Sequence, residues 1–295
     1  MPFHFKKSES PAKAVRRVCR ERIGAALGRL RESDRPAAVH GVRKEIKKLR
    51  AIFRLVRGEI GRGVYRKGAK ALRAAAGSLT ATRDARATLK AFEKLNGRSA
   101  GRFSEVEKAL RKHSRKEARR FQKHDSVALA DRILRKTNRR VGDLKIQASG
   151  WAVIEPGLRK SYRRGRSALR LARKEPLPEN FHEWRKHVKD LWFYLRLLHP
   201  AWPPKIHVMV DELELLGEQL GDDHDLFLLK QFVAENCAGQ IKEVKALNRL
   251  IEARQKKLRS TALKLGSRLY AATPADICGR LEHCWNAWQG RTSRK

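Results

Sequence analysis

The chain has 295 residues, with 69 Lys and Arg against 31 Asp and Glu, which gives a formal net charge of +38 at pH 7. Hydrophobic residues make up 41%, and the charges are spread through periodic segments, so the composition excludes a disordered basic tail and indicates a folded protein with a polyanionic partner. The sequence contains no apolar run of about 18 residues and begins without the apolar stretch of a signal peptide, so we expect a cytoplasmic protein.

The four cysteines have no C-x-x-C spacing and are predicted to be buried, reduced thiols. Apolar residues recur at spacings of three and four along the chain, and no segment alternates in the manner of a β-strand. The sequence therefore predicts an all-α fold without a metal or cofactor. In chain order, the predicted helices cover residues 11–31, 35–57, 63–80, 83–96, 103–124, 126–140, 157–173, 178–199, 204–220, 223–237, 240–271 and 274–289.

The second of these helices has a counterpart 142 residues later. The stretch HGVRKEIKKL, which begins at His40, aligns with HEWRKHVKDL, which begins at His182, and the histidine, an Arg-Lys pair and a lysine match. Two more landmarks recur in the same order at offsets of 143 and 141 residues. They are an Arg-x-x-x-Arg segment before each histidine, Arg16 and Arg20 or Arg159 and Arg163, and a Leu-x-x-x-x-Asp segment after it, ending at Asp84 or Asp225.

These ordered matches predict two copies of one helical unit, residues 1–145 and 146–295, each long enough for a bundle of about four helices. The two halves differ in charge. Residues 1–150 contain 42 basic and 14 acidic residues, a net of +28, whereas residues 151–295 contain 27 and 17, a net of +10. The first half is therefore the stronger candidate for an anion-binding surface.

On each repeated helix the cations share one face. At about 100° per residue they fall within a stripe roughly 120° wide, opposite an apolar face. A solvated helix face is the ordinary explanation of such charges, but it usually mixes signs, and like charges at i,i+4 destabilise a helix by a few tenths of a kcal/mol. Both copies accept that cost at equivalent positions, which favours anion binding. The first stripe comprises His40, Arg43, Lys44, Lys47, Arg50 and Arg54, and the second comprises His182, Arg185, Lys186, Lys189 and Arg196.

The doubled H-x-x-R-K-x-x-K helix, with the segments before and after it, resembles the CHAD family, the conserved histidine α-helical domain, over residues 11–290. The resemblance implies two four-helix bundles related by a pseudo-two-fold axis, a basic cavity between them, binding of inorganic polyphosphate and association with polyphosphate granules. Trp192 stands where the first copy has Arg50, and His224 stands where it has Arg83, so we expect the second half to hold the ligand differently or less tightly. The resemblance implies ligand-lining roles for both stripes and for Arg16, Arg20, Arg159 and Arg163.

A basic protein that associates with nucleic acid is the main alternative. Single-strand binders interleave aromatic side chains with cations, and duplex readers present Asn or Gln on a recognition helix. The two stripes contain neither, and Phe193 is the aromatic residue expected near the second stripe. Non-specific binding of nucleic acid at low salt is still expected from the net charge alone.

A metal-dependent phosphohydrolase that uses His224 and Asp225 is a weaker alternative, based on the acidic cluster at residues 222–225. The residue that repeats is the aspartate, because Asp84 occupies the equivalent position in the first copy. Asp222 and Asp225 also suit the start of a helix, as an N-cap and a first-turn carboxylate. We therefore expect Asp84 and Asp225 to hold neighbouring arginines in place, and we expect no catalysis.

Overall fold

The structure is a computed structural model that describes residues 3–32, 35–97, 101–123, 126–237 and 239–290. Within these residues it contains helices and no strand, so the predicted all-α fold is confirmed. The first half comprises α1 (Pro11–Arg29), α2 (Arg35–Leu55), α3 (Arg62–Gly77), α4 (Thr80–Asn96), α5 (Ser104–Lys123) and α6 (Ser126–Gly142). The second half comprises η1 (Gly150–Val153), α7 (Glu155–Lys174), α8 (Pro178–Leu197), η2 (His199–Ala201), α9 (Pro204–Asn236), α10 (Ile241–Leu269) and α11 (Pro274–Gln289).

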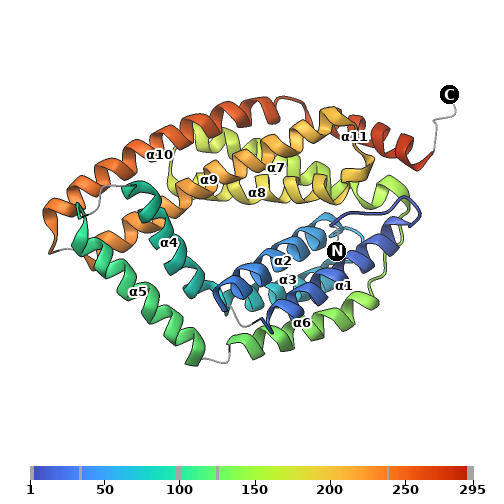
Figure 1. Ribbon diagram of the computed structural model, residues 1–295. Coiled ribbons are helices and arrows are strands. Elements are labelled where there is room, and N and C mark those ends of the chain that lie inside the picture. The colour runs from blue at the N-terminus through green and yellow to red at the C-terminus, as the bar shows by residue number, and fades with distance from the viewer. Residues whose placement is uncertain (1–2, 33–34, 98–100, 124–125, 238, 291–295) are drawn as a thin grey trace.

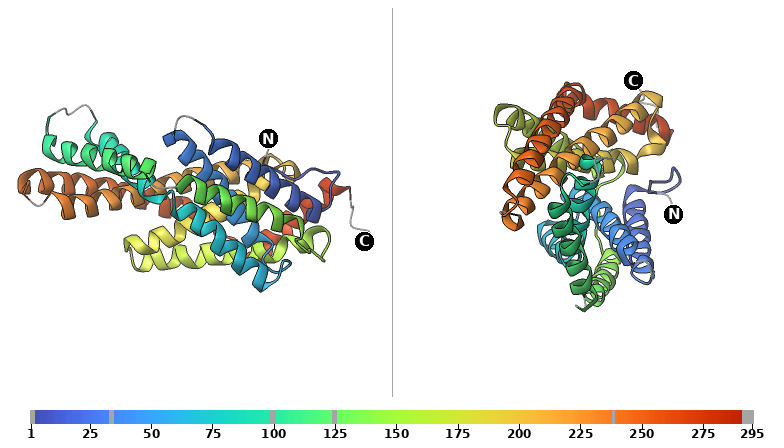
Figure 2. Two further views of the ribbon diagram at one scale, coloured as in Figure 1. Left: turned by 90° about the horizontal axis from the view of Figure 1, so that it is seen from below. Right: turned by 60° about the vertical axis from the view of Figure 1, so that its left-hand side comes forward.

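The helices form two packed groups joined by a hairpin (Figures 1 and 2). Helices α1, α2, α3 and α6 pack together in one group, and α7, α8, α9 and α10 form the other, with α11 against α7. The hairpin of α4 and α5 leaves the first group and packs on α9 and α10 of the second. Segments of the first half thus reach across the molecule to the second.

The repeated helices have nearly the same bounds in the two halves. Helix α8 begins 143 residues after α2 and ends 142 residues after it, which is consistent with the repeat predicted from the sequence. In both helices the apolar face is buried, as at Ile46 and Val188. The amphipathic pattern therefore positions both histidine helices, with their cations away from the core.

Helix α9 is continuous, so the predicted break between residues 220 and 223, with Asp222 as an N-cap, was wrong. Leu220 and Leu226 on either side of the expected break are both buried, and this packing outweighs the weak helix preference of the Gly-Asp-Asp segment. Gly221 also faces the Arg185 side chain, whose Nη2 would lie 3.2 Å from a Cβ at that position. In the first half the corresponding stretch is broken at Ser78 between α3 and α4.

The hydrophobic core does not stop at the predicted boundary between residues 145 and 146. One buried cluster runs from Phe5 through α2 and α8 to Trp285, and a second joins α4 and α5 to the far ends of α9 and α10 around Phe92 and Leu229. The division into two domains stays a prediction.

As expected, three cysteines are buried and Cys284 is partly buried, and none of these described residues forms a disulfide. Among the helices of the described ranges, none has the length and apolar character needed to cross a bilayer.

Candidate anion-binding cavity

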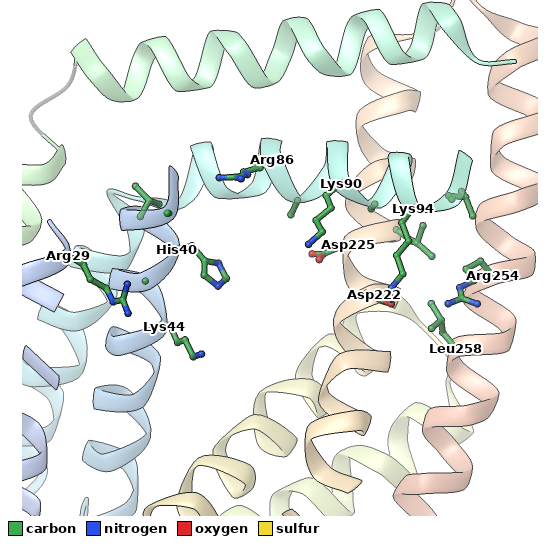
Figure 3. Close-up of a pocket in the computed structure, with 17 residues that line it drawn as sticks. Arg29, His40, Lys44, Arg86, Lys90, Lys94, Asp222, Asp225, Arg254 and Leu258 are labelled. Carbon is green, nitrogen blue, oxygen red and sulfur yellow. Dashed lines mark hydrogen bonds and ion pairs between the residues drawn. The ribbon is translucent and has the colours of Figure 1, made fainter. Parts of the chain in front are cut away.

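A cavity of about 1070 Å³ opens among α2, α4, α9 and α10, next to the end of α1 (Figure 3). We call it the basic cavity, because six Arg or Lys side chains and one histidine line it against two carboxylates. The positive charges come from α1, α2, α4 and α10, whereas both carboxylates come from α9. The charged and titratable lining residues are Arg29, His40, Lys44, Arg86, Lys90, Lys94, Asp222, Asp225 and Arg254.

Helix α2 supplies one wall through the start of the first stripe. His40 and Lys44 lie one turn apart and are exposed, whereas Val42 and Ile46 between and beyond them are buried in the core. Figure 3 shows both side chains directed away from α2 into the cavity. The amphipathic spacing of the helix therefore delivers a histidine and an ammonium group to this wall.

Helix α4 supplies a second wall that the sequence analysis missed. Arg86, Lys90 and Lys94 follow one another at intervals of four, so they share one helix face, and all three are exposed. Phe92 on the opposite face is buried against α5. The spacing is visible in the sequence, but α4 contains no histidine, and these three cations have no counterparts in the second copy of the repeat.

The carboxylates of α9 meet the cations of α4 across the cavity. Asp222 forms an ion pair with Lys94, and Figure 3 shows Asp225 beside Lys90. Asp223 instead turns away from the cavity and accepts a hydrogen bond from Arg259 Nε at 2.7 Å. Burial raises the pKa of the Asp223 carboxyl, against the opposing effect of Arg259.

The His224 and Asp225 pair of the phosphohydrolase alternative lies beside a second histidine. The His224 ring lies 4.1 Å from the His182 ring, centroid to centroid, in a tilted stack. Asp225 lines the basic cavity, but His224 and His182 do not. Over the described ranges, no group of three or more His, Cys, Asp or Glu side chains is arranged to hold a metal ion.

The second stripe packs largely against its own half. Arg185 and Lys189 cover Gly221 and Gly217 of α9, where a side chain would occupy their space. The Lys189 ammonium lies 4.4 Å from the centre of the Trp192 ring, and the Arg196 guanidinium lies 4.8 Å from it. Burial, helped by the nearby Arg185, lowers the pKa of Lys189 to about 8. These contacts give the second stripe structural partners.

Trp192 is the aromatic ring over which Lys189 and Arg196 of the second stripe lie, and Phe193, the aromatic residue expected near this stripe, packs beside Trp192. Phe193 packs edge to face on Phe3 of the N-terminal segment. Lys186 projects to solvent and forms an ion pair with Glu183 at 2.7 Å. Neither Lys186 nor Trp192 lines the basic cavity.

The rest of the first stripe runs toward the junction of the two halves. Arg43 donates a hydrogen bond to the Ala76 carbonyl at 2.8 Å, in the last turn of α3. Arg54 forms an ion pair with Asp190 of α8. Burial lowers the pKa of Arg50, which lies one turn before Arg54.

Arg16 and Arg20 line a different hollow, of about 380 Å³, along α1. Arg16 Nε donates a hydrogen bond to the Leu144 carbonyl at 3.1 Å. Arg159 is exposed and pairs with Glu155, one turn earlier on α7. The predicted residues that lie outside the basic cavity are thus Arg16, Arg20, Arg43, Lys47, Arg50, Arg54, Asp84, Arg159, Arg163, His182, Arg185, Lys186, Lys189 and Arg196.

The basic cavity therefore brings together His40, Lys44 and Asp225 of the predicted site, and adds cations from α1, α4 and α10. Roles for Asp84 and Asp225 in holding arginines stay predictions, and the side chain of Arg83 lies outside the described part of the chain. Sequence reasoning could have found the α4 residues from their spacing. Arg29 and Arg254 have no such signal, because only the tertiary fold brings them to the cavity.

These features define an all-helical protein with a cation-lined cavity between segments of its two halves. A family model described as the CHAD domain matches residues 14–234, and the chain belongs to the CHAD family. The fold is also similar to the crystal structure of the CHAD domain from the plant Ricinus communis, with 15% identity, 96% coverage of each chain and a TM-score of 0.57. A comparison with curated proteins found no match.

Proposed function

We propose that the protein binds inorganic polyphosphate in the basic cavity. The observation that carries this proposal is the lining, six Arg or Lys side chains and His40 facing about 1070 Å³, against two carboxylates. Phosphate oxygens accept charge-assisted hydrogen bonds, bidentate ones from arginine and mobile ones from lysine. A chain of phosphates offers these oxygens and no other recognition features, and the cavity offers cations and few other polar groups.

Nucleic acid fits this lining less well. The described lining residues include no Phe, Tyr or Trp on which a base could stack, and Trp192 beside the second stripe is buried beneath Lys189 and Arg196. The cavity's cations come from several helices around a hollow, which suits a flexible strand better than a rigid duplex. Membership of the CHAD family favours the same ligand.

A ligand of the basic cavity must compete with Asp222 for Lys94, because these two side chains form an ion pair. An arriving phosphate must take Lys94 from Asp222, so the carboxylate lowers the affinity for weakly charged anions more than for a polyanion that contacts several cations together. We propose that this binding proceeds without catalysis, in the cytoplasm and at polyphosphate granules.

Binding of long-chain polyphosphate and of single-stranded DNA at physiological salt tests the proposal. Lys44→Ala/Lys90→Ala should weaken polyphosphate binding about tenfold or more, because each lost charge-assisted contact contributes at least about 1 kcal/mol. The matched control is Lys242→Ala/Lys245→Ala, which removes two exposed charges of α10 outside the cavity. Single-stranded DNA bound as tightly as polyphosphate, with neither affinity changed by the cavity substitutions, would contradict the proposal.

Phosphate release from polyphosphate tests the absence of catalysis. We expect no release above background with Mg²⁺ or Mn²⁺ added. Steady metal-dependent release that disappears in Asp225→Ala would instead establish the phosphohydrolase alternative.

A further inference from the structure

Helix α6 carries a row of cations that belongs to neither histidine stripe. Its positions follow the spacing i, i+3, i+4, i+7 and i+8, which places them within about 140° of the helix surface and along about 12 Å of its length. All five are exposed, whereas Leu134 and Val141 on the opposite face are buried. We call this row the outer stripe; it consists of Arg132, Arg135, Lys136, Arg139 and Arg140.

Few acidic groups neutralise the outer stripe. Asp131 pairs with Arg135 at 2.6 Å, and within the described ranges no acidic side chain forms an ion pair with the other four cations. Three pairs of like charges stand at i,i+4 along the row, an arrangement that destabilises an isolated helix. The helix dipole favours Arg139 and Arg140 in the last turn, but it offers little to Lys136 one turn earlier or to Arg132 two turns earlier. An anionic partner accounts for the whole row.

The surface continues from α6 onto α1. Arg16 Nε reaches the carbonyl of Leu144 just beyond α6, and Arg20 Nη2 lies 3.0 Å from the point where a Cβ of Gly142 would be. Both arginines line the hollow of about 380 Å³ on α1. Arg16 and Arg20 thus adjoin the end of the outer stripe.

The outer stripe lies apart from the basic cavity. Figure 1 shows α6 along the lower edge of the molecule, on the side of the first group away from α9 and α10, and α6 contributes no residue to the cavity. The helix that corresponds to α6 in the second half carries no such row. Helix α11, which packs on α7 as α6 packs on α1, contains Arg280 as its one Arg or Lys.

We propose that the outer stripe binds a second segment of polyphosphate, so that one molecule bridges two stretches of polymer. This inference rests on the proposed function of the cavity. Charge complementarity selects a polyanion, and a flexible strand can follow the convex row of α6 and enter the hollow on α1. Two binding surfaces on one molecule give long chains an avidity that short chains lack, and allow them to be cross-linked.

Light scattering of the full chain with long-chain polyphosphate tests the bridging. Arg132→Gln/Lys136→Gln/Arg139→Gln should lower scattering about fivefold or more, while the affinity for a short polyphosphate that fills only the cavity stays within about twofold. Lys242→Gln/Lys245→Gln/Lys257→Gln removes three exposed charges elsewhere and should scatter like the wild type. Arg132→Lys/Lys136→Arg/Arg139→Lys keeps the charge and should also retain scattering.

Equal losses of scattering in the outer-stripe variant and the α10 control would overturn the inference, because net charge alone would then explain condensation. Loss of duplex DNA affinity in the outer-stripe variant that exceeds its loss of polyphosphate affinity would assign the surface to nucleic acid and also overturn it. The two proposals fail differently. If the wild type does not bind short-chain polyphosphate, the proposed function of the basic cavity is contradicted. If short-chain binding is normal and the outer-stripe variant scatters light like the wild type, only the bridging is contradicted.

Discussion

Helices α2 and α8 carry the same cationic motif in different surroundings. The first two members of the α2 stripe, His40 and Lys44, open into a cavity whose other walls come from α4, α9 and α10. The equivalent face of α8 lies on α9, where Gly217 and Gly221 leave room for its lysine and arginine. A repeated motif therefore does not make two equivalent sites, because the neighbouring helix decides whether a cation faces a ligand or the protein itself.

The break between α3 and α4 causes much of this difference. In the second half, α9 continues through the corresponding stretch and packs along α8. In the first half the chain breaks at Ser78, and α4 departs to pack on α9. Arg86, Lys90 and Lys94 consequently face across the molecule, which gives the first stripe a second cationic wall.

The largest expected effect concerns the ion pair that joins the two halves. Asp190 of α8 occupies the position equivalent to Lys48 in α2, and it forms an ion pair with Arg54 of the first stripe. Asp190→Ala leaves a largely buried guanidinium without its partner and should lower the free energy of unfolding by about 3 kcal/mol. Urea denaturation measures the loss.

The double variant Arg54→Met/Asp190→Leu is the control for that prediction, because apolar side chains of similar size should recover most of the stability. Asp190→Ala as stable as the wild type would contradict a stabilising role of this ion pair between the halves.

A second difference lies where α7 crosses the end of α2. A Cβ at Gly157 would clash with the backbone carbonyl of Leu55, whereas the equivalent position in α1 is a buried alanine, Ala14. Gly157→Ala should therefore destabilise the protein by about 2 kcal/mol. Gly24→Ala, in a helix position with open space around it, should stabilise it by about 0.5–1 kcal/mol. Thermal unfolding of both variants gives the comparison, and equal shifts would contradict the close crossing.

The burial of Lys189 should appear in the pH dependence of stability. Its pKa of about 8 lies below the ordinary value of 10.5, so between these values the unfolded chain binds more protons than the folded one. The free energy of unfolding of the wild type should then rise relative to Lys189→Met by on the order of 1–2 kcal/mol from pH 8 to 10.5. Lys47→Met removes the exposed amine at the equivalent position of α2. A similar rise relative to that variant would show that burial of Lys189 is not the cause.

Local sequence patterns predicted the helices and the repeat, because the spacing of apolar residues within a segment depends on that segment alone. The bounds of α2 and α8 and the burial of Ile46 and Val188 followed from that spacing. The continuity of α9 did not, because the signal of Gly221-Asp222 is local and the packing that outweighs it comes from other helices. The predicted break put the start of a helix near Asp222, in the part of α9 that lines the basic cavity.

Membership of the site was harder to predict than the fold. Chemical type and repetition singled out both stripes, but a side chain lines a cavity only if the backbone of another element leaves space before it. Arg16 reaches the Leu144 carbonyl beyond α6, and Lys189 packs on Gly217 of α9, and both contacts depend on tertiary packing. Arg254 reaches the cavity from α10 without any motif around it.

Polyphosphate affinity of two single variants at equivalent positions tests the unequal roles of the stripes most directly. Lys44 lines the basic cavity, whereas Lys186, 142 residues later, is exposed beside Glu183. Lys44→Ala should weaken binding by about three- to tenfold, the effect of one lost charge-assisted contact, and Lys186→Ala should change it by less than about twofold. An equal loss in the two variants, or a greater loss for Lys186→Ala, would contradict a site built on the first stripe.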